Sequence, residues 1–244
     1  MRCLLALMFC VVQTVSAVAQ DDKDTVTRYL ETALSDQGRE VKVEGFSGAL
    51  SSRATIDKLT IADADGVWLT LTDAVLDWDR SALLRGRIEI NEISADQILL
   101  PRLPAPQSST RPEAKSFTLP ELPLGIRIDA INVQSLVLGA PVVGIPAALS
   151  VTGSLSLSNG SGEVHATLSR QDGPNGSFEL ISSYSNETRM LNIDLSLSED
   201  ADGLVSNILK LPDRPTLELS VTGTAPIDDF VAQVVLKSDG QERL

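Results

Sequence analysis

Cysteine, histidine and aromatic side chains are scarce in this chain of 244 residues, and each scarcity excludes something. Cys3 and Cys10 are the only cysteines and both lie within residues 1–19, so the rest of the chain has no disulfide to form. The single histidine, His165, argues against most zinc sites and most histidine-based catalysis. Aromatic residues make up 4% of the sequence, so any core must be built from aliphatic side chains.

Positively charged residues are also few in comparison with negatively charged ones. The chain carries 20 lysines and arginines against 33 aspartates and glutamates, which gives a formal charge of −13. Because an acidic surface repels phosphate backbones, we expect no nucleic-acid partner. Hydrophobic residues nevertheless make up 43% of the chain, which is typical of a folded protein rather than a disordered one.

Motifs for catalysis, metals and cofactors are also missing from the sequence. It contains no Gly-x-Ser-x-Gly nucleophile turn and no glycine-rich phosphate loop. Asp200–Gly203 resembles the middle of a calcium loop, but Leu209 would stand at the twelfth position, where a glutamate is required. Asp63–Gly66 fails the same comparison because Ile61 would be the first ligand. We therefore expect no catalytic, metal or cofactor site and no enzyme activity.

Residues 1–19 have the pattern of an export segment. Arg2 precedes an apolar run that is shorter than the roughly 20 residues of a membrane-spanning helix. Ala17-Val18-Ala19 then supplies a cleavage site of the A-x-A type before an acidic stretch. We expect residues 1–19 to be a cleaved signal peptide, with a retained N-terminal anchor as the alternative.

Residues 22–38 carry a helical pattern. Asp22 or Asp24 can cap the start of this helix, and Gly38 can end it. Its polar face is acidic, whereas a helix that lies on a membrane surface would carry lysine and arginine there. We expect an amphipathic helix that packs on the following sheet through the apolar positions Val26, Tyr29, Leu30, Ala33 and Leu34.

From residue 41 onward, polar and apolar residues alternate, as in strands with one buried and one wet face. Asp63–Gly66 predicts a hairpin turn between two of these strands. In the strand that begins at Val67, the apolar positions move from odd to even numbers, which predicts a bulge near Thr72–Asp73. A helical turn is expected at 81–85 before Gly86. Residues 41–100 are therefore predicted to form a first β unit.

Residues 101–123 hold six of the twelve prolines and are predicted to be a proline-rich linker or a long excursion from the sheet. Strand patterns resume over 124–244, with a helix expected from Gly203 to Leu211. The chain ends on a turn at Asp239-Gly240 followed by half a strand, which would leave an unpaired sheet edge. We expect 124–244 to be a second β unit, truncated from a longer protein.

These patterns predict a mainly β fold, an elongated and curved antiparallel sheet with a short N-terminal helix and minor helical insertions. Two architectures fit the alternation. One is a closed sandwich with a packed core, and the other is an open sheet that offers its apolar face as a groove for acyl chains. In the groove, the expected lining residues are Val67, Leu69, Leu71, Ile88, Ile90, Ile126, Ile128, Leu155 and Leu157.

Two stretches of the first unit are distinctive. They read VKVEGFSGALSSRATIDKLTIADADGVWLTL at 41–71 and LDWDRSALLRGRIEI at 76–90. They resemble the N-terminal region of the TamB family, the inner-membrane components of the bacterial translocation and assembly module. More distantly, that family resembles AsmA-like and chorein-like proteins, which share a repeating β groove lined with apolar residues.

The resemblance implies a function and a place in the cell. It implies a β groove in the periplasm, anchored to the inner membrane where the N-terminal segment is retained, that passes phospholipid acyl chains toward the outer membrane. It also implies support for outer-membrane protein assembly, including autotransporters and thus protein secretion. The implied partner is a TamA-like barrel of the Omp85 family, contacted through a C-terminal region that this sequence lacks. The alternative is a secreted structural or adhesive β-repeat protein with no lipid cargo.

Overall fold

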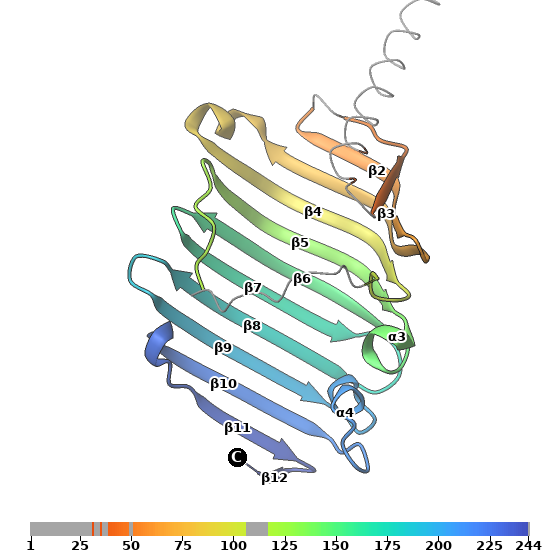
Figure 1. Cartoon of the computed structure of the whole chain (residues 1–244), viewed down its shortest axis with the longest axis vertical. Coiled ribbons are helices and arrows are strands. Elements are labelled where there is room, and N and C mark those ends of the chain that lie inside the picture. Colours follow the sequence, from red (N-terminus) through yellow and green to blue (C-terminus); the bar gives the residue numbers. More distant parts are fainter. Residues whose placement is uncertain (1–30, 32–34, 36–38, 49–50, 106–116, 244) are drawn as a thin grey trace, which may run out of the picture.

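The computed structural model describes residues 31, 35, 39–48, 51–105 and 117–243. The predicted signal peptide at 1–19 and almost all of the predicted helix at 22–38 lie outside these residues. The described strands form one open, curved sheet in which every strand pairs with the next along the chain (Figure 1). They are β1 (Glu40–Glu44), β2 (Arg53–Asp63), β3 (Gly66–Asp79), β4 (Arg87–Leu100), β5 (Gly125–Leu138), β6 (Ala147–Ser158), β7 (Ser161–Arg170), β8 (Gly176–Ser185), β9 (Met190–Glu199), β10 (Leu217–Pro226), β11 (Gln233–Ser238) and β12 (Gln241–Glu242).

The predicted mainly β fold with minor helical insertions is confirmed. The turn expected at 81–85 is the 3-10 helix η1 (Arg80–Arg85), which Gly86 ends with a φ of 68°. The helix expected from Gly203 to Leu211 is shorter, as α4 (Leu204–Ile208), because the chain turns away at Lys210, where φ is 52°. Two further short helices, α3 (Ala140–Val143) and η2 (Ile227–Asp229), were not expected.

One strand pair departs from the predicted antiparallel sheet. β4 and β5 are parallel, with Ile90 opposite Ile128 and Ile98 opposite Leu136. A parallel pair needs a connection that returns the chain to the starting end of the first strand. Residues 101–124 link β4 to β5 along the chain, and the strands of the two predicted β units belong to one continuous sheet.

The alternation of β3 breaks near Thr72–Asp73, as predicted from the sequence, and the facing strand β2 breaks its alternation at the same level. Asp73 has a φ of 49°, and neither Asp73 nor Asp57 opposite it forms a ladder pair. The register between β2 and β3 is the same on both sides of this point, because both strands interrupt their alternation together. The register shift between these two strands lies instead beside Ile61, where β3 has one extra residue at Trp68.

Asp63 holds the start of the connection between β4 and β5 against the β2–β3 hairpin. Arg102 Nη2 lies 2.5 Å from Asp63 Oδ1, and the backbone N–H of Ala105 donates to Asp63 Oδ2 at 2.8 Å. The Asp63 side chain is 8% exposed. The hydrogen bonds from the Arg102 guanidinium and the Ala105 amide hold the pKa of Asp63 well below its ordinary value of 3.8.

We expect Asp63→Asn to lower the melting temperature at pH 7. A carboxyl group whose pKa is depressed in the folded state stabilises the fold above its unfolded pKa, near 3.8, and loses this effect as the pH falls through the folded value. The difference from the wild type should therefore shrink below about pH 4. Thermal melts of both proteins from pH 7 to pH 3 measure it, with the exposed neighbour Asp65→Asn as the control. A difference that does not change with pH would contradict the ion pair.

Candidate functional site

The strand registers define an apolar face of the sheet. Residues directly opposite each other on paired strands point to the same side, so a chain of ladder pairs follows one face across the sheet. One such row crosses ten strands, from β2 to β11, without a polar residue. It consists of Ile56, Ala74, Ala95, Val133, Val151, Leu168, Phe178, Leu197, Leu219 and Leu236.

A second row runs beside the first and is equally apolar. It consists of Ala54, Leu76, Ile93, Ile131, Gly153, Ala166, Leu180, Leu195, Val221 and Val234. Ten strands at about 4.8 Å spacing make each row about 43 Å long. We name these two rows together the central apolar rows.

Eight of the nine predicted lining residues lie on this face. Ile90, Ile128 and Leu155 are successive partners in one ladder, and Ile88, Ile126 and Leu157 are successive partners in the next. Leu71 is paired through Ile98 and Leu136 with Leu149, which lies two residues from Val151 of the first central apolar row. Leu69 lies two residues from Leu71 along the same strand.

Val67 is the exception. It pairs with Ala62, which follows the apolar-face residue Ile61 and therefore points to the other side. The extra residue at Trp68 causes this, because it breaks the alternation between Val67 and Leu69. Val67 is 47% exposed, and its prediction as a lining residue is corrected.

The apolar face is only partly covered by the described residues. Among the twenty residues of the central apolar rows, Ala95 and Val133 are buried and the others retain intermediate exposure. Leu155, in the adjoining ladder, is 37% exposed. A closed sandwich would pack such residues at interior density. The described strands instead form a single open sheet, which excludes the sandwich for this part of the chain.

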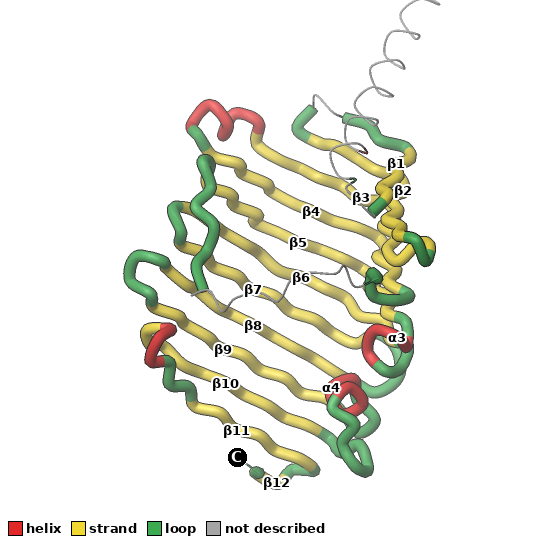
Figure 2. The backbone as a smooth tube through the Cα atoms, in the orientation of Figure 1, coloured by secondary structure: helices red, strands yellow, loops and turns green. Residues whose placement is uncertain are grey.

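Short helices flank the apolar face at one end of its strands. α3 and α4 lie beside each other there, in front of the sheet (Figure 2). Val143 of α3 and Ile208 of α4 line a cavity of about 220 Å³ together with Leu168, Phe178 and Leu197 of the sheet. The cavity is therefore continuous with the first central apolar row.

The opposite end of the strands is flanked by the described segment that leads into β5. The rings of Phe117 and Tyr184 meet edge to face, with their centroids 5.1 Å apart. Asn186 fixes the backbone of Leu119 by two hydrogen bonds, one from the Leu119 N–H at 2.8 Å and one to its carbonyl at 2.9 Å. The apolar face over β6–β8 is thus a trough with a border at each end of its strands.

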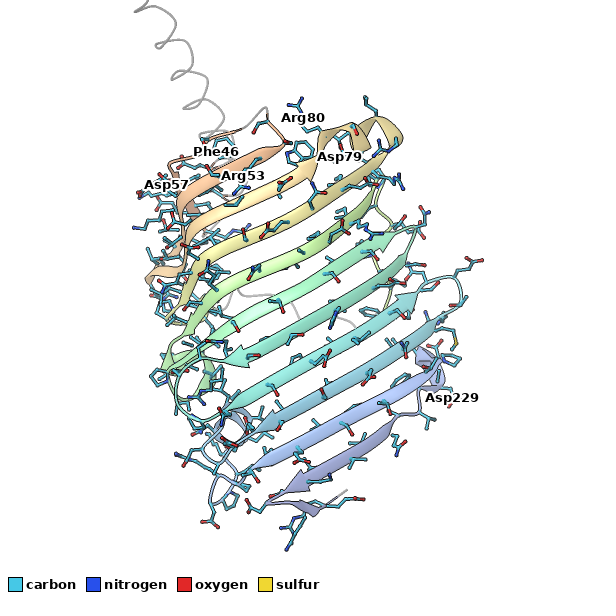
Figure 3. All side chains as sticks on the ribbon, turned by 180° about the vertical axis from the view of Figure 1, so that it is seen from behind. Phe46, Arg53, Asp57, Asp79, Arg80 and Asp229 are labelled. Atoms are coloured by element: carbon cyan, nitrogen blue, oxygen red, sulfur yellow. The ribbon has the colours of Figure 1, made fainter. Side chains whose placement is uncertain are left out.

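The other face of the sheet is more polar. Over β5–β10 one of its rows consists of Asn132, Thr152, Thr167, Glu179, Ser196 and Ser220. Figure 3 looks onto this face from behind, where short polar side chains stand along the strands. His165 lies here, half exposed and 3.2 Å from Glu179 Oε1, as expected for a residue on a strand surface.

Metal sites and membrane-spanning helices are not found in the part of the chain that the structure describes. No group of three or more His, Cys, Asp or Glu residues there could hold a metal ion. None of its helices has the length and apolar character needed to cross a membrane. Comparison of the chain with protein-family models, with curated proteins and with solved structures finds no match. The resemblance to the TamB family therefore stays a prediction from the sequence.

Proposed function

We propose that the apolar face of this sheet carries phospholipid acyl chains. The observation that supports this function is the uninterrupted pair of central apolar rows, which remain partly exposed over ten strands. Leaving this much aliphatic surface in contact with water is unfavourable, at about 25 cal/mol per Å². Acyl chains can cover it without needing any hydrogen bond from the sheet.

The shape of the face suits a chain-like ligand better than a rigid one. Its cross-strand rows are about 43 Å long and are bordered at the strand ends, so a flexible chain can lie along them. The face presents aliphatic groups and few aromatic rings, which gives contact area without fixed geometry. A ligand held this way can slide, because neighbouring positions along a row are chemically alike.

The cellular role that goes with this activity is transport of phospholipid through the periplasm toward the outer membrane. In that role the protein supports outer-membrane protein assembly, including autotransporters, together with a TamA-like Omp85 barrel. Residues 1–19 serve as a signal peptide or as an inner-membrane anchor. These statements rest on the sequence resemblance to the TamB family. The alternative is an adhesive or structural β-repeat protein with no lipid cargo. That function does not require an exposed apolar trough.

We expect Leu155→Arg to weaken phospholipid binding by about tenfold or more. Leu155 lies on the apolar face and is 37% exposed, so a guanidinium there enters the path of the acyl chain while the strand can still fold. Displacement of a fluorescent phospholipid from the purified protein measures the affinity. Ser154→Arg is the matched control, because Ser154 pairs with His165 on the polar face.

The result also separates the two candidate functions. The transport proposal expects strong binding by the wild type and by Ser154→Arg. An adhesive repeat would bind no phospholipid in any of the three proteins. Equal binding by Leu155→Arg and the wild type would show that the lipid lies elsewhere on the molecule.

A further inference from the structure

A buried arginine on the apolar face has an unused hydrogen-bond donor. Arg170 pairs with Leu149 at the end of β7, so its side chain lies on the same face as Leu168. That side chain is 5% exposed. Its Nε donates to Asp172 Oδ1 at 3.3 Å, whereas Nη1 is buried and has no hydrogen-bond partner. Burial of a guanidinium nitrogen without an acceptor is costly, so a native function for Nη1 is expected.

Arg170 lines the 220 Å³ cavity beneath α4. Gly176 at the start of β8 lies next to Arg170 and pairs with Glu199 on β9. A side chain at position 176 would touch the Arg170 stem at 3.6 Å and Glu199 Cβ at 3.9 Å. The glycine therefore leaves the space between the two charged residues open toward the cavity.

The acidic groups near Arg170 already have other partners. Both oxygens of Glu199 accept backbone N–H groups at the start of α4, from Val205 at 2.9 Å and from Ser206 at 2.8 Å. Asp172 Oδ1 accepts the backbone N–H of Ala148 at 2.7 Å besides its longer contact with Arg170. Nη1 of Arg170 is thus left as an unpaired, buried donor behind the wall of a cavity that is otherwise lined largely by aliphatic side chains.

We propose that this cavity binds the headgroup of an aliphatic amphiphile whose chain ends in an anionic oxygen group. The guanidinium of Arg170 turns toward the cavity so that a carboxylate or phosphate oxygen accepts from Nη1, and the chain runs from Phe178 and Leu168 onto the first central apolar row. A guanidinium suits such oxygens because it is permanently charged and carries its donors in a planar fork. This inference rests on the proposed function, since the acyl chain is expected to occupy the same trough.

The overall charge of −13 disfavours binding of an anionic headgroup elsewhere on the protein. Away from Arg170 the acidic chain repels anions, so an anionic headgroup gains nothing from the general surface. The buried position of Arg170 keeps its charge from being screened by salt, unlike that of an exposed arginine. Preference for an anionic headgroup should therefore depend on this one side chain and persist at physiological salt.

The experiment compares dodecanoate with dodecanol, two ligands of equal chain length, by calorimetry below their aggregation concentrations. We expect the wild type to bind dodecanoate about tenfold more tightly or better, as a charged hydrogen bond implies. Arg170→Met keeps the length of the side chain and removes the donor, so both ligands should bind it alike. Arg127→Met is the control, because the Arg127 side chain is 70% exposed and lies on the polar face.

The outcomes separate the headgroup site from the trough. Equal affinities of the wild type for both ligands overturn the headgroup site, and this comparison needs no variant to fold. A preference that survives in folded Arg170→Met overturns it too. Inorganic phosphate alone should fail to compete at millimolar concentration, and strong competition would show a site for free anions without a chain. If the wild type binds neither ligand, the trough itself is wrong and the headgroup site falls with it.

Discussion

Val133→Asp should destabilise the protein by about 3 kcal/mol, whereas Asn132→Asp next to it should cost about 0.5 kcal/mol. Val133 is 8% exposed and lies in the first central apolar row, between Ala95 and Val151. A carboxylate there would be buried among aliphatic side chains without a partner. Asn132 faces the opposite side, where it is exposed and pairs with Thr152.

Thermal melts of the two variants measure this difference. At this chain length, a loss of 3 kcal/mol corresponds to a decrease in melting temperature of about 10 °C. Circular dichroism before each melt shows whether the variant is folded at the starting temperature. Equal decreases for the two variants would mean that β5 has another register and that the apolar face is assigned incorrectly.

The strand pattern predicted most of the apolar face because alternation survives in nearly every strand. Ile88 and Ile90, like Leu155 and Leu157, occur two residues apart and share a face as expected. At a bulge the strand has one extra residue, so odd-numbered and even-numbered residues exchange faces there. Simple alternation therefore predicts the wrong face for Val67, because the extra residue of β3 lies at Trp68.

Two further irregularities could have been predicted from the same signal. In β5 the apolar positions move from even to odd between Ile128 and Ile131 and back to even at Leu136. In β4 the same moves occur at the paired positions from Ile90 to Ile93 and from Ala95 to Ile98. Gln134 Nε2 donates to Asp96 Oδ1 at 3.0 Å beside the second of these shifts. Matching shifts in two strands indicate that the strands are neighbours in register.

The parallel pairing of β4 and β5 could not be predicted from alternation. A hairpin and a crossover give the same pattern within each strand, so alternation does not distinguish them. The described start of the connection is held by contacts between distant residues, such as Arg102 with Asp63, which lie 39 residues apart. Periodicity within a strand carries no information about contacts of this kind.

The position of Arg170 on the apolar face could have been predicted from the sequence. Val164, Ala166, Leu168 and Arg170 alternate along β7, so the last of them belongs to the apolar face. Leu195, Leu197 and Glu199 do the same along β9. A charged residue that ends an apolar alternation is ambiguous, because strands often end at that point. The structure shows that both side chains are buried, and the unpaired Nη1 of Arg170 is what supports the proposed headgroup site.

The central claim is that acyl chains lie on the apolar face, and site-specific photocrosslinking tests it most directly. Benzoylphenylalanine is placed at Leu180, in the second central apolar row, or at the adjacent exposed Glu179 on the polar face. Each protein is incubated with vesicles of radiolabelled phosphatidylethanolamine and phosphatidylglycerol, irradiated and separated from free lipid. We expect a labelled adduct at position 180 and none above background at position 179. Labelling of both positions alike, or of neither, would contradict a lipid path along this face.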